Sequence, residues 1–129
     1  MRLPLALAAL LPALIAPAAG WAGSFNGNWP LTISRAQHGN GAYCLTLAAG
    51  GLASLSGEGV GGTLPYGTYQ VINHTLVATI DAEGETQNAG LVFAAPASNG
   101  SIGKGIFDEV YGGEAINTGV VSFGAKGGC

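Results

Sequence analysis

The segment GTYQVINHTLVATID, residues 67–81, constrains the fold of this chain more than any other. If Asn73 and His74 form a two-residue turn, one register separates a mostly apolar face from a face of hydroxyl and amide side chains. Asn is among the few residues that tolerate the positive φ angles of such turns. An uninterrupted strand is the alternative, and it would mix the two faces. The pairs of the predicted β-hairpin are Val71 with Leu76, Tyr69 with Ala78 and Gly67 with Ile80.

Several other segments of strand length alternate apolar with polar residues, and glycine-rich turns separate them. Pro30 lies in the first of these segments and cannot donate a backbone hydrogen bond, so it should lie at the start of a strand or at an edge position. No segment after the N-terminal residues combines helical spacing with helix caps. A turn is expected at residues 96–100. In addition to the hairpin, the predicted strands are residues 29–34, 42–48, 52–56, 88–95, 101–110 and 115–125.

This series of strands places the chain in the all-β class. Eight strands joined mostly by short links predict a small antiparallel eight-stranded up-and-down barrel, because closure of the sheet removes its exposed edges. A two-sheet β-sandwich is the alternative architecture.

The N-terminal residues have the layout of a signal peptide: one Arg, an apolar run, and then small residues. The apolar run, residues 3–15, is shorter than the roughly 20 residues that span a bilayer, so we expect no membrane anchor. Cleavage after Ala22 is preferred to cleavage after Gly20. The sequence thus predicts a signal peptide at residues 1–22, a single β-barrel domain at residues 23–129, and a secreted or periplasmic location.

Two cysteines, Cys44 and Cys129, are present in a chain that we expect to be exported. Oxidising compartments favour disulfides, and the spacing is not the C-x-x-C of a redox-active pair. We therefore predict a structural Cys44–Cys129 bridge. The cysteines and the two histidines, His38 and His74, show none of the spacings of zinc sites. No motif indicates a cofactor, so we expect neither metal nor cofactor.

Charge and motif content narrow the possible functions. The chain has four basic and seven acidic residues and a net charge of −3, so it has no basic patch for nucleic acid. Asp108 and Glu109 are adjacent and would point to opposite faces of a strand, which argues against the carboxylate pair of a glycosidase. No nucleophile and base emerge as a pair, so catalysis is the third-ranked function and would need His74 and Asp108 to meet in one pocket.

The first predicted strand opens with Gly27-Asn28-Trp29. In this motif the chain resembles the calycins, which include lipocalins and avidins and whose first strand begins with G-x-W. The resemblance implies an eight-stranded antiparallel barrel whose tryptophan closes one end and whose open end holds a small, often apolar ligand. The later T-D-Y of lipocalins is absent, and so is the arginine near the last strand that covers the tryptophan. Lys126 is the candidate substitute for that arginine.

The leading functional hypothesis is a non-catalytic exported barrel that binds a small or apolar ligand. The alternative is a protein-interaction or inhibitor module that uses exposed loops at residues 57–62 and 82–87, with a protein as its partner. Aromatic rings would suit the lining of a ligand site, although most of these residues are as easily explained as core. The expected interior residues are Trp29, Tyr43, Leu45, Tyr69, Val71, Leu76 and Phe93, and the candidate ligand-binding residues are Trp29, Tyr43, Tyr66, Tyr69, Phe93 and Tyr111.

Overall fold

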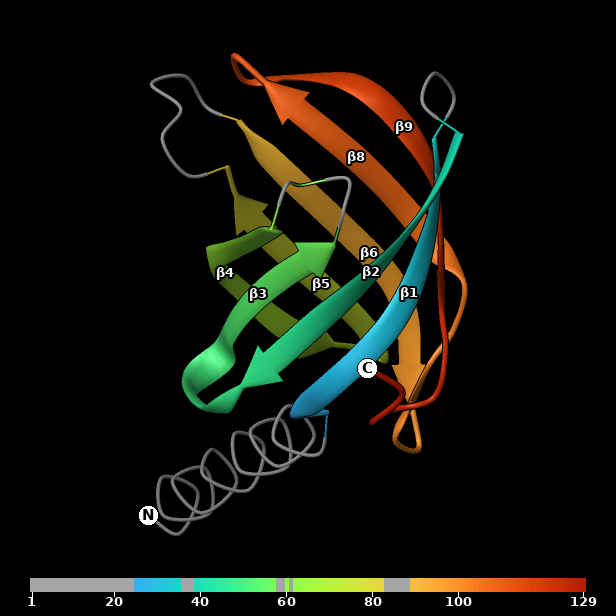
Figure 1. Ribbon diagram of the computed structural model, residues 1–129. Coiled ribbons are helices and arrows are strands. Elements are labelled where there is room, and N and C mark those ends of the chain that lie inside the picture. The colour runs from blue at the N-terminus through green and yellow to red at the C-terminus, as the bar shows by residue number, and fades with distance from the viewer. Residues whose placement is uncertain (1–24, 36–38, 58–59, 61, 83–88) are drawn as a thin grey trace, which may run out of the picture.

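Antiparallel strands follow one another around a single curved sheet in the computed structural model (Figure 1). The structure describes residues 25–35, 39–57, 60, 62–82 and 89–129. The predicted signal peptide and its cleavage site therefore lie outside the described residues. The strands are β1 (Gly27–Arg35), β2 (Gly39–Ala48), β3 (Leu52–Gly57), β4 (Gly62–Ile72), β5 (Thr75–Asp81), β6 (Gly90–Ser98), β7 (Ser101–Ile102), β8 (Gly105–Tyr111) and β9 (Glu114–Phe123), and a short 3-10 helix, η1 (Ala49–Gly51), links β2 to β3.

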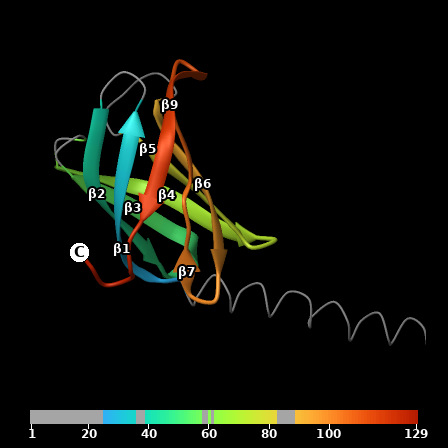
Figure 2. The same cartoon turned by 90° about the vertical axis from the view of Figure 1, so that its right-hand side faces the viewer.

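The sheet closes on itself. In the described part of the chain, the order around the barrel is β1-β2-β3-β4-β5-β6-β8-β9, and β9 pairs with β1. The two-residue β7 pairs only with the end of β6 and adds no ninth wall strand. Figure 2 shows the same strands from the side. The predicted eight-stranded up-and-down barrel is confirmed, and the two-sheet sandwich is not the architecture.

The predicted β-hairpin is formed by β4 and β5 in the predicted register. Asn73 and His74 form its turn, with φ angles of 50° and 59°. Positive φ at both positions gives the turn the twist that matches the flanking strands. The alternation then directs Tyr69, Val71, Leu76, Ala78 and Ile80 into the barrel, where all five side chains are buried.

The predicted single strand at residues 101–110 is wrong in one respect, because the chain breaks it at Gly103 and Lys104 into β7 and β8. The preceding strand, β6, is also longer than predicted and continues through Pro96 to Ser98, so that only Asn99 and Gly100 form the turn. Beyond the break, Gly105 lies so close to β6 that a Cβ atom there would be 2.1 Å from a backbone oxygen. Glycine is thus required where β8 begins.

Pro30 was expected at the start of a strand or at an edge, but β1 begins earlier, at Gly27, and Pro30 lies instead where the β1–β9 ladder ends. It pairs with Cys44 of β2, whereas the β1–β9 register begins only at Leu31. Beyond that point the Pro30 carbonyl accepts one hydrogen bond, from Gly124 N–H at 2.7 Å. The missing Pro30 N–H therefore leaves no gap in the β1–β9 ladder.

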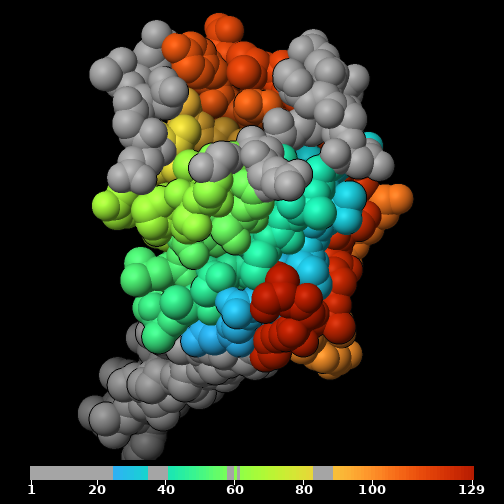
Figure 3. Space-filling model, in the orientation of Figure 1, coloured from blue at the N-terminus to red at the C-terminus, as the bar shows by residue number. Residues whose placement is uncertain are grey.

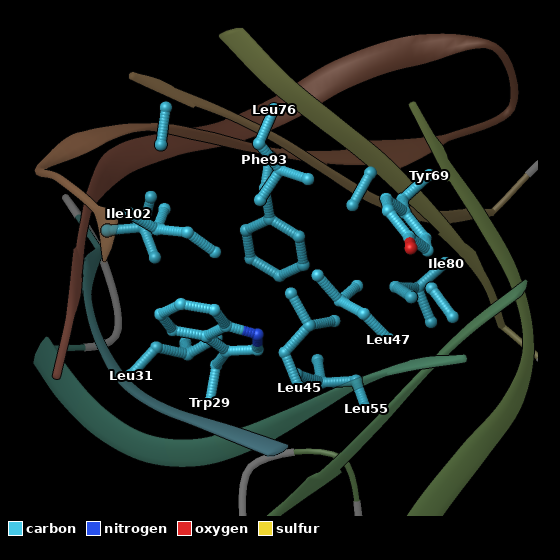
Figure 4. Close-up of a cluster of buried hydrophobic side chains, with 14 of the residues drawn as sticks. Trp29, Leu31, Leu45, Leu47, Leu55, Tyr69, Leu76, Ile80, Phe93 and Ile102 are labelled. Atoms are coloured by element: carbon cyan, nitrogen blue, oxygen red, sulfur yellow. The ribbon is translucent and has the colours of Figure 1, made fainter. Parts of the chain in front are cut away.

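The barrel interior holds one continuous hydrophobic core. All seven expected interior residues are buried within it. The rings of Phe93 and Phe107, from neighbouring strands, have centroids 5.6 Å apart. Figure 4 shows Trp29 and Phe93 among aliphatic side chains from several strands. The largest fully buried side chains are Trp29, Phe93, Phe107, Ile33, Leu45, Leu47, Leu55, Leu76, Ile80 and Val121.

A disulfide joins Cys44 of β2 to Cys129, with a Cα–Cα distance of 6.0 Å. In Figure 2 the chain leaves the end of β9, passes β1 and ends beside β2. The predicted bridge is therefore confirmed.

In the part of the chain that the structure describes, no helix has the length and apolar character needed to cross a membrane.

Candidate functional site

The two ends of the barrel interior differ in their side chains. At one end β1 begins, and Phe25 and Trp29 are buried there; we call it the Trp29 end. At the other end β1 finishes and β9 begins, and Asn117 is the buried polar residue; we call it the Asn117 end. The β8–β9 turn marks the Asn117 end at the top of Figure 1.

The Trp29 end is closed by residues that precede β1. The indole N–H of Trp29 donates a hydrogen bond to the carbonyl of Phe25 at 2.8 Å, and the two rings have centroids 6.1 Å apart. Tyr69 donates its hydroxyl hydrogen to Oδ1 of Asn26, which ties the same segment to β4. Burial away from solvent raises the pKa of Tyr69, because desolvation disfavours the phenolate.

The C-terminal tail covers the outside of this closure. Nζ of Lys126 lies 5.9 Å from the centroid of the Trp29 ring, within cation–π range. The next residue, Gly127, donates its N–H to the carbonyl of Asn28 at 2.7 Å. Lys126 thus lies over the tryptophan, as the resemblance to the calycins implies for a substitute of their arginine. Figure 3 shows the tail lying against β1 and β2 on the molecular surface.

Gly27 makes this close approach of the tail possible. Its φ angle is 145°, and a Cβ atom there would lie 2.7 Å from Cδ of Lys126. The glycine of the G-x-W motif therefore has a packing role that is separate from the tryptophan two residues later.

At the Asn117 end a polar side chain is buried inside the apolar barrel. Asn117 is 5% exposed, and neither its Oδ1 nor its Nδ2 has a hydrogen-bond partner among the described residues. It lies directly opposite Glu109 of β8 in the antiparallel register. Glu109 is half-buried, and its Oε1 atom is shielded from solvent. Across the sheet, the row continues through Leu91 and Ile80, which are both buried.

The candidate ligand-binding aromatics separate into two groups. Trp29, Tyr43, Tyr69 and Phe93 are buried in the core, whereas Tyr66 and Tyr111 are 59% and 44% exposed. Gly67 pairs with Ala53 on the inner face of β4, which leaves the neighbouring Tyr66 on the outside. The prediction that these residues bind a ligand stays a prediction, and only the four buried ones belong to the interior.

The structure does not bring the candidate acid–base residues together. His74 is exposed in the β4–β5 turn at the Trp29 end. Asp108 follows the fully buried Phe107 in β8, so its side chain points to the outer face. Among the residues that the structure describes, no group of three or more His, Cys, Asp or Glu side chains could hold a metal ion. His38 lies outside the described residues.

Three hollows are lined by described residues. One of about 180 Å³ lies at the Trp29 end beside the β4–β5 and β6–β7 turns, and Phe25, Val71 and His74 contribute to it. A second, of about 450 Å³, is an open groove around the disulfide. A third, of about 190 Å³, lies where β5 and β6 approach the Asn117 end, with Asp81 and Val110 in its lining.

Sequence reasoning missed Asn117 and the inward direction of Glu109 as features of a site. A usable signal was present in β8, because Glu109 stands two residues after Phe107 and so shares its face. For Asn117 the same signal comes from Val121, four residues later in β9 and fully buried.

No protein-family model matches this chain, and comparison with curated proteins and with solved structures found no match.

Proposed function

We propose that this protein is an exported, non-catalytic barrel that binds a small apolar molecule in its interior. The observation that carries the proposal is the asymmetry of the closed barrel. The Trp29 end is closed twice, by the Phe25–Asn26 segment inside and by the Lys126 tail outside. The site proposed for the ligand is therefore the Asn117 end of the interior, where the buried Asn117 and the half-buried Glu109 lie opposite each other.

The resemblance to the calycins supports the same function. The barrel, the G-x-W motif at the start of β1 and the cation over Trp29 all agree with that group. The disulfide supports export, because a structural bridge persists in an oxidising compartment. The interior that would receive the ligand is apolar, which suits a molecule whose transfer out of water is itself favourable.

Fluorescence titration with N-phenylnaphthylamine tests the proposal, because this neutral dye becomes bright in apolar surroundings. We expect saturable binding by the purified protein, and a co-purifying small molecule in native mass spectrometry of protein from its own source. Leu91→Ala removes apolar contact area from the inner face of β6 and should alter the dye affinity about threefold or more.

Leu52→Ala is the matched control, because Leu52 is 57% exposed on the outside of β3. It should leave the dye affinity unchanged. If Leu52→Ala changes the dye affinity and Leu91→Ala does not, the dye binds on the outer surface. That result would refute an interior site. Absence of both dye binding and a co-purifying molecule would leave the interaction module as the better hypothesis.

A further inference from the structure

We infer that Asn117 is the anchor for the polar group of the ligand, and that the ligand is an apolar molecule carrying one hydroxyl or carboxamide group. This inference rests on the proposed function and specifies the chemistry of the same interior site. It predicts discrimination between molecules of equal size that differ only in their head group.

The burial of Asn117 is the first step of the argument. In β9, Asn117 and Val121 lie on the inner face, and they are 5% and 0% exposed. An amide placed among such apolar neighbours is unfavourable unless its donor and its acceptor are both satisfied. Within the described residues, Asn117 satisfies neither. The great majority of buried polar side chains do have a partner, so this exception calls for an explanation.

The position of the Asn117 amide indicates where a hydrogen-bonding group of the ligand would lie. Asn117 lies in the inner row that continues through Glu109, Leu91 and Ile80. Residues directly opposite in an antiparallel pair have Cβ atoms about 5 Å apart. The amide of Asn117 therefore lies within reach of a group placed beside the Glu109 carboxylate, at the end of the interior opposite the Trp29 closure.

The hydrogen-bonding capacity of the amide defines the head group. Oδ1 accepts hydrogen bonds and Nδ2 donates them, so the complementary group must both donate and accept. A hydroxyl or a carboxamide does so while remaining neutral. A carboxylate would offer acceptors only, and its charge would be disfavoured by burial next to the Glu109 side chain. A hydrocarbon without a head group would leave both amide atoms of Asn117 unsatisfied.

Competition against N-phenylnaphthylamine with three probes of matched length tests the inference: decanol, undecane and decanoate. For the wild-type protein we expect decanol to displace the dye at a concentration about tenfold lower than either of the other two. In Asn117→Leu, a replacement with the same number of side-chain heavy atoms and the same branching, undecane should compete as well as decanol. Thr118→Leu makes a polar-to-apolar change one residue away on the exposed outer face, and it should preserve the wild-type order.

A purely structural role for Asn117, for example as a partner of a buried water molecule, gives a different result. Thermal unfolding without any probe then changes in Asn117→Leu, while the ranking of the three probes stays as in the wild type. That outcome would overturn the inference. Equal binding of the three probes by the wild-type protein would also overturn the inference. This comparison uses the wild-type protein alone and does not depend on whether a variant folds.

The two proposals fail in distinguishable ways. If the dye binds and the three probes compete equally, the interior binds apolar molecules and only the assignment to Asn117 is wrong. If neither the dye nor any probe binds, the proposed function is wrong and the head-group site falls with it.

Discussion

The ammonium group of Lys126 lies over the ring of Trp29, with Nζ 5.9 Å from the ring centroid. This contact joins the last residues of the chain to the first strand, at the end of the barrel that the Phe25–Asn26 segment closes from inside. The stem of the lysine also packs against Gly27. The tail is therefore held by the cation, by a backbone hydrogen bond from Gly127 and by the disulfide at Cys129.

Replacement of this lysine tests the contribution of the cation. We expect Lys126→Ala to lower the free energy of unfolding by about 0.5–1 kcal/mol, the size of an exposed cation–π contact. Urea unfolding followed by tryptophan fluorescence would measure the change. Lys126→Arg retains the charge over the ring and should remain near the wild-type value. Equal losses in the two variants would show that packing of the lysine stem, and not its charge, holds the tail.

Removal of the disulfide should destabilise the barrel more strongly. The bridge spans a sequence separation of 85 residues, and closing a long loop restricts the unfolded chain. For the double variant Cys44→Ser, Cys129→Ser we expect a loss of about 2–4 kcal/mol in urea unfolding. A reducing agent should lower the wild-type midpoint to that of the variant and leave the variant unaffected. If the reducing agent leaves the unfolding midpoint of the wild type unchanged, the result would contradict the presence of the bridge.

The close approach of β8 to β6 makes Gly105 sensitive to substitution. A Cβ atom there would lie 2.1 Å from the backbone oxygen of Ala94, which cannot move aside as a side chain can. We expect Gly105→Ala to cost about 1–3 kcal/mol. Gly103→Ala is the matched control, because its nearest atom is Cγ of Pro96 at 3.1 Å, and it should cost less than about 0.5 kcal/mol. Thermal denaturation of both variants would measure the two losses of stability. Equal losses would contradict the special requirement for glycine at position 105.

Tyr69 links stability to alkaline pH. Tyrosine in the unfolded chain ionises near pH 10, and burial raises the pKa of Tyr69 in the folded protein. The folded state therefore keeps a proton that the unfolded state loses, so stability falls as the pH rises above about 10. Tyr69→Phe should reduce the steepness of that fall in urea midpoints measured between neutral and alkaline pH.

The same substitution has a second effect at neutral pH. Tyr69 donates a hydrogen bond to Asn26, and its loss should lower the free energy of unfolding by about 1 kcal/mol. Tyr66→Phe serves as the control, because Tyr66 is exposed. Parallel pH profiles for the wild type and Tyr69→Phe would rule out the ionisation of Tyr69 as a cause of the alkaline loss.

The hairpin turn offers a stabilising substitution. His74 has a φ angle of 59°, a left-handed conformation that is unfavourable by roughly 1–2 kcal/mol for residues with a Cβ atom. Because Asn-Gly is the preferred sequence for such a turn, His74→Gly should raise the unfolding midpoint by the equivalent of about 1 kcal/mol. His74→Ala keeps the Cβ atom and should give no gain. A lower midpoint for His74→Gly would show that contacts of the imidazole outweigh the backbone preference.

Local rules were sufficient to predict the walls of the barrel. The register of β4 and β5 follows from a two-residue turn and strict alternation, and both are visible in the sequence. The Cys44–Cys129 pairing was also predictable, because a chain that is expected to be exported and has two cysteines offers each cysteine one partner. The strand at residues 101–110 could not be divided correctly, because its break at Gly103 and Lys104 is a matter of tertiary pairing.

The polar end of the interior was harder to predict than the apolar core. The sequence indicates that Glu109 shares a face with Phe107, but it does not show that this face is closed to solvent at the barrel end. Asn117 stands in a segment whose neighbours Ile116 and Val120 are apolar yet 51% and 38% exposed. Apolar residues therefore occur on both faces of β9, and only barrel closure shows that the amide points inward.

The pairing of β1 with β9 joins the first strand of the barrel to the last, whereas the other wall strands pair with neighbours that lie close in sequence. A chain made from its N-terminus therefore carries β1 with one unsatisfied side until residues 114–123 have appeared. Contacts between such distant segments form late, because the entropy of a long loop must be overcome first. The barrel thus has a seam between β1 and β9, and the residues that follow β9 carry Cys129 past this seam to Cys44 of β2.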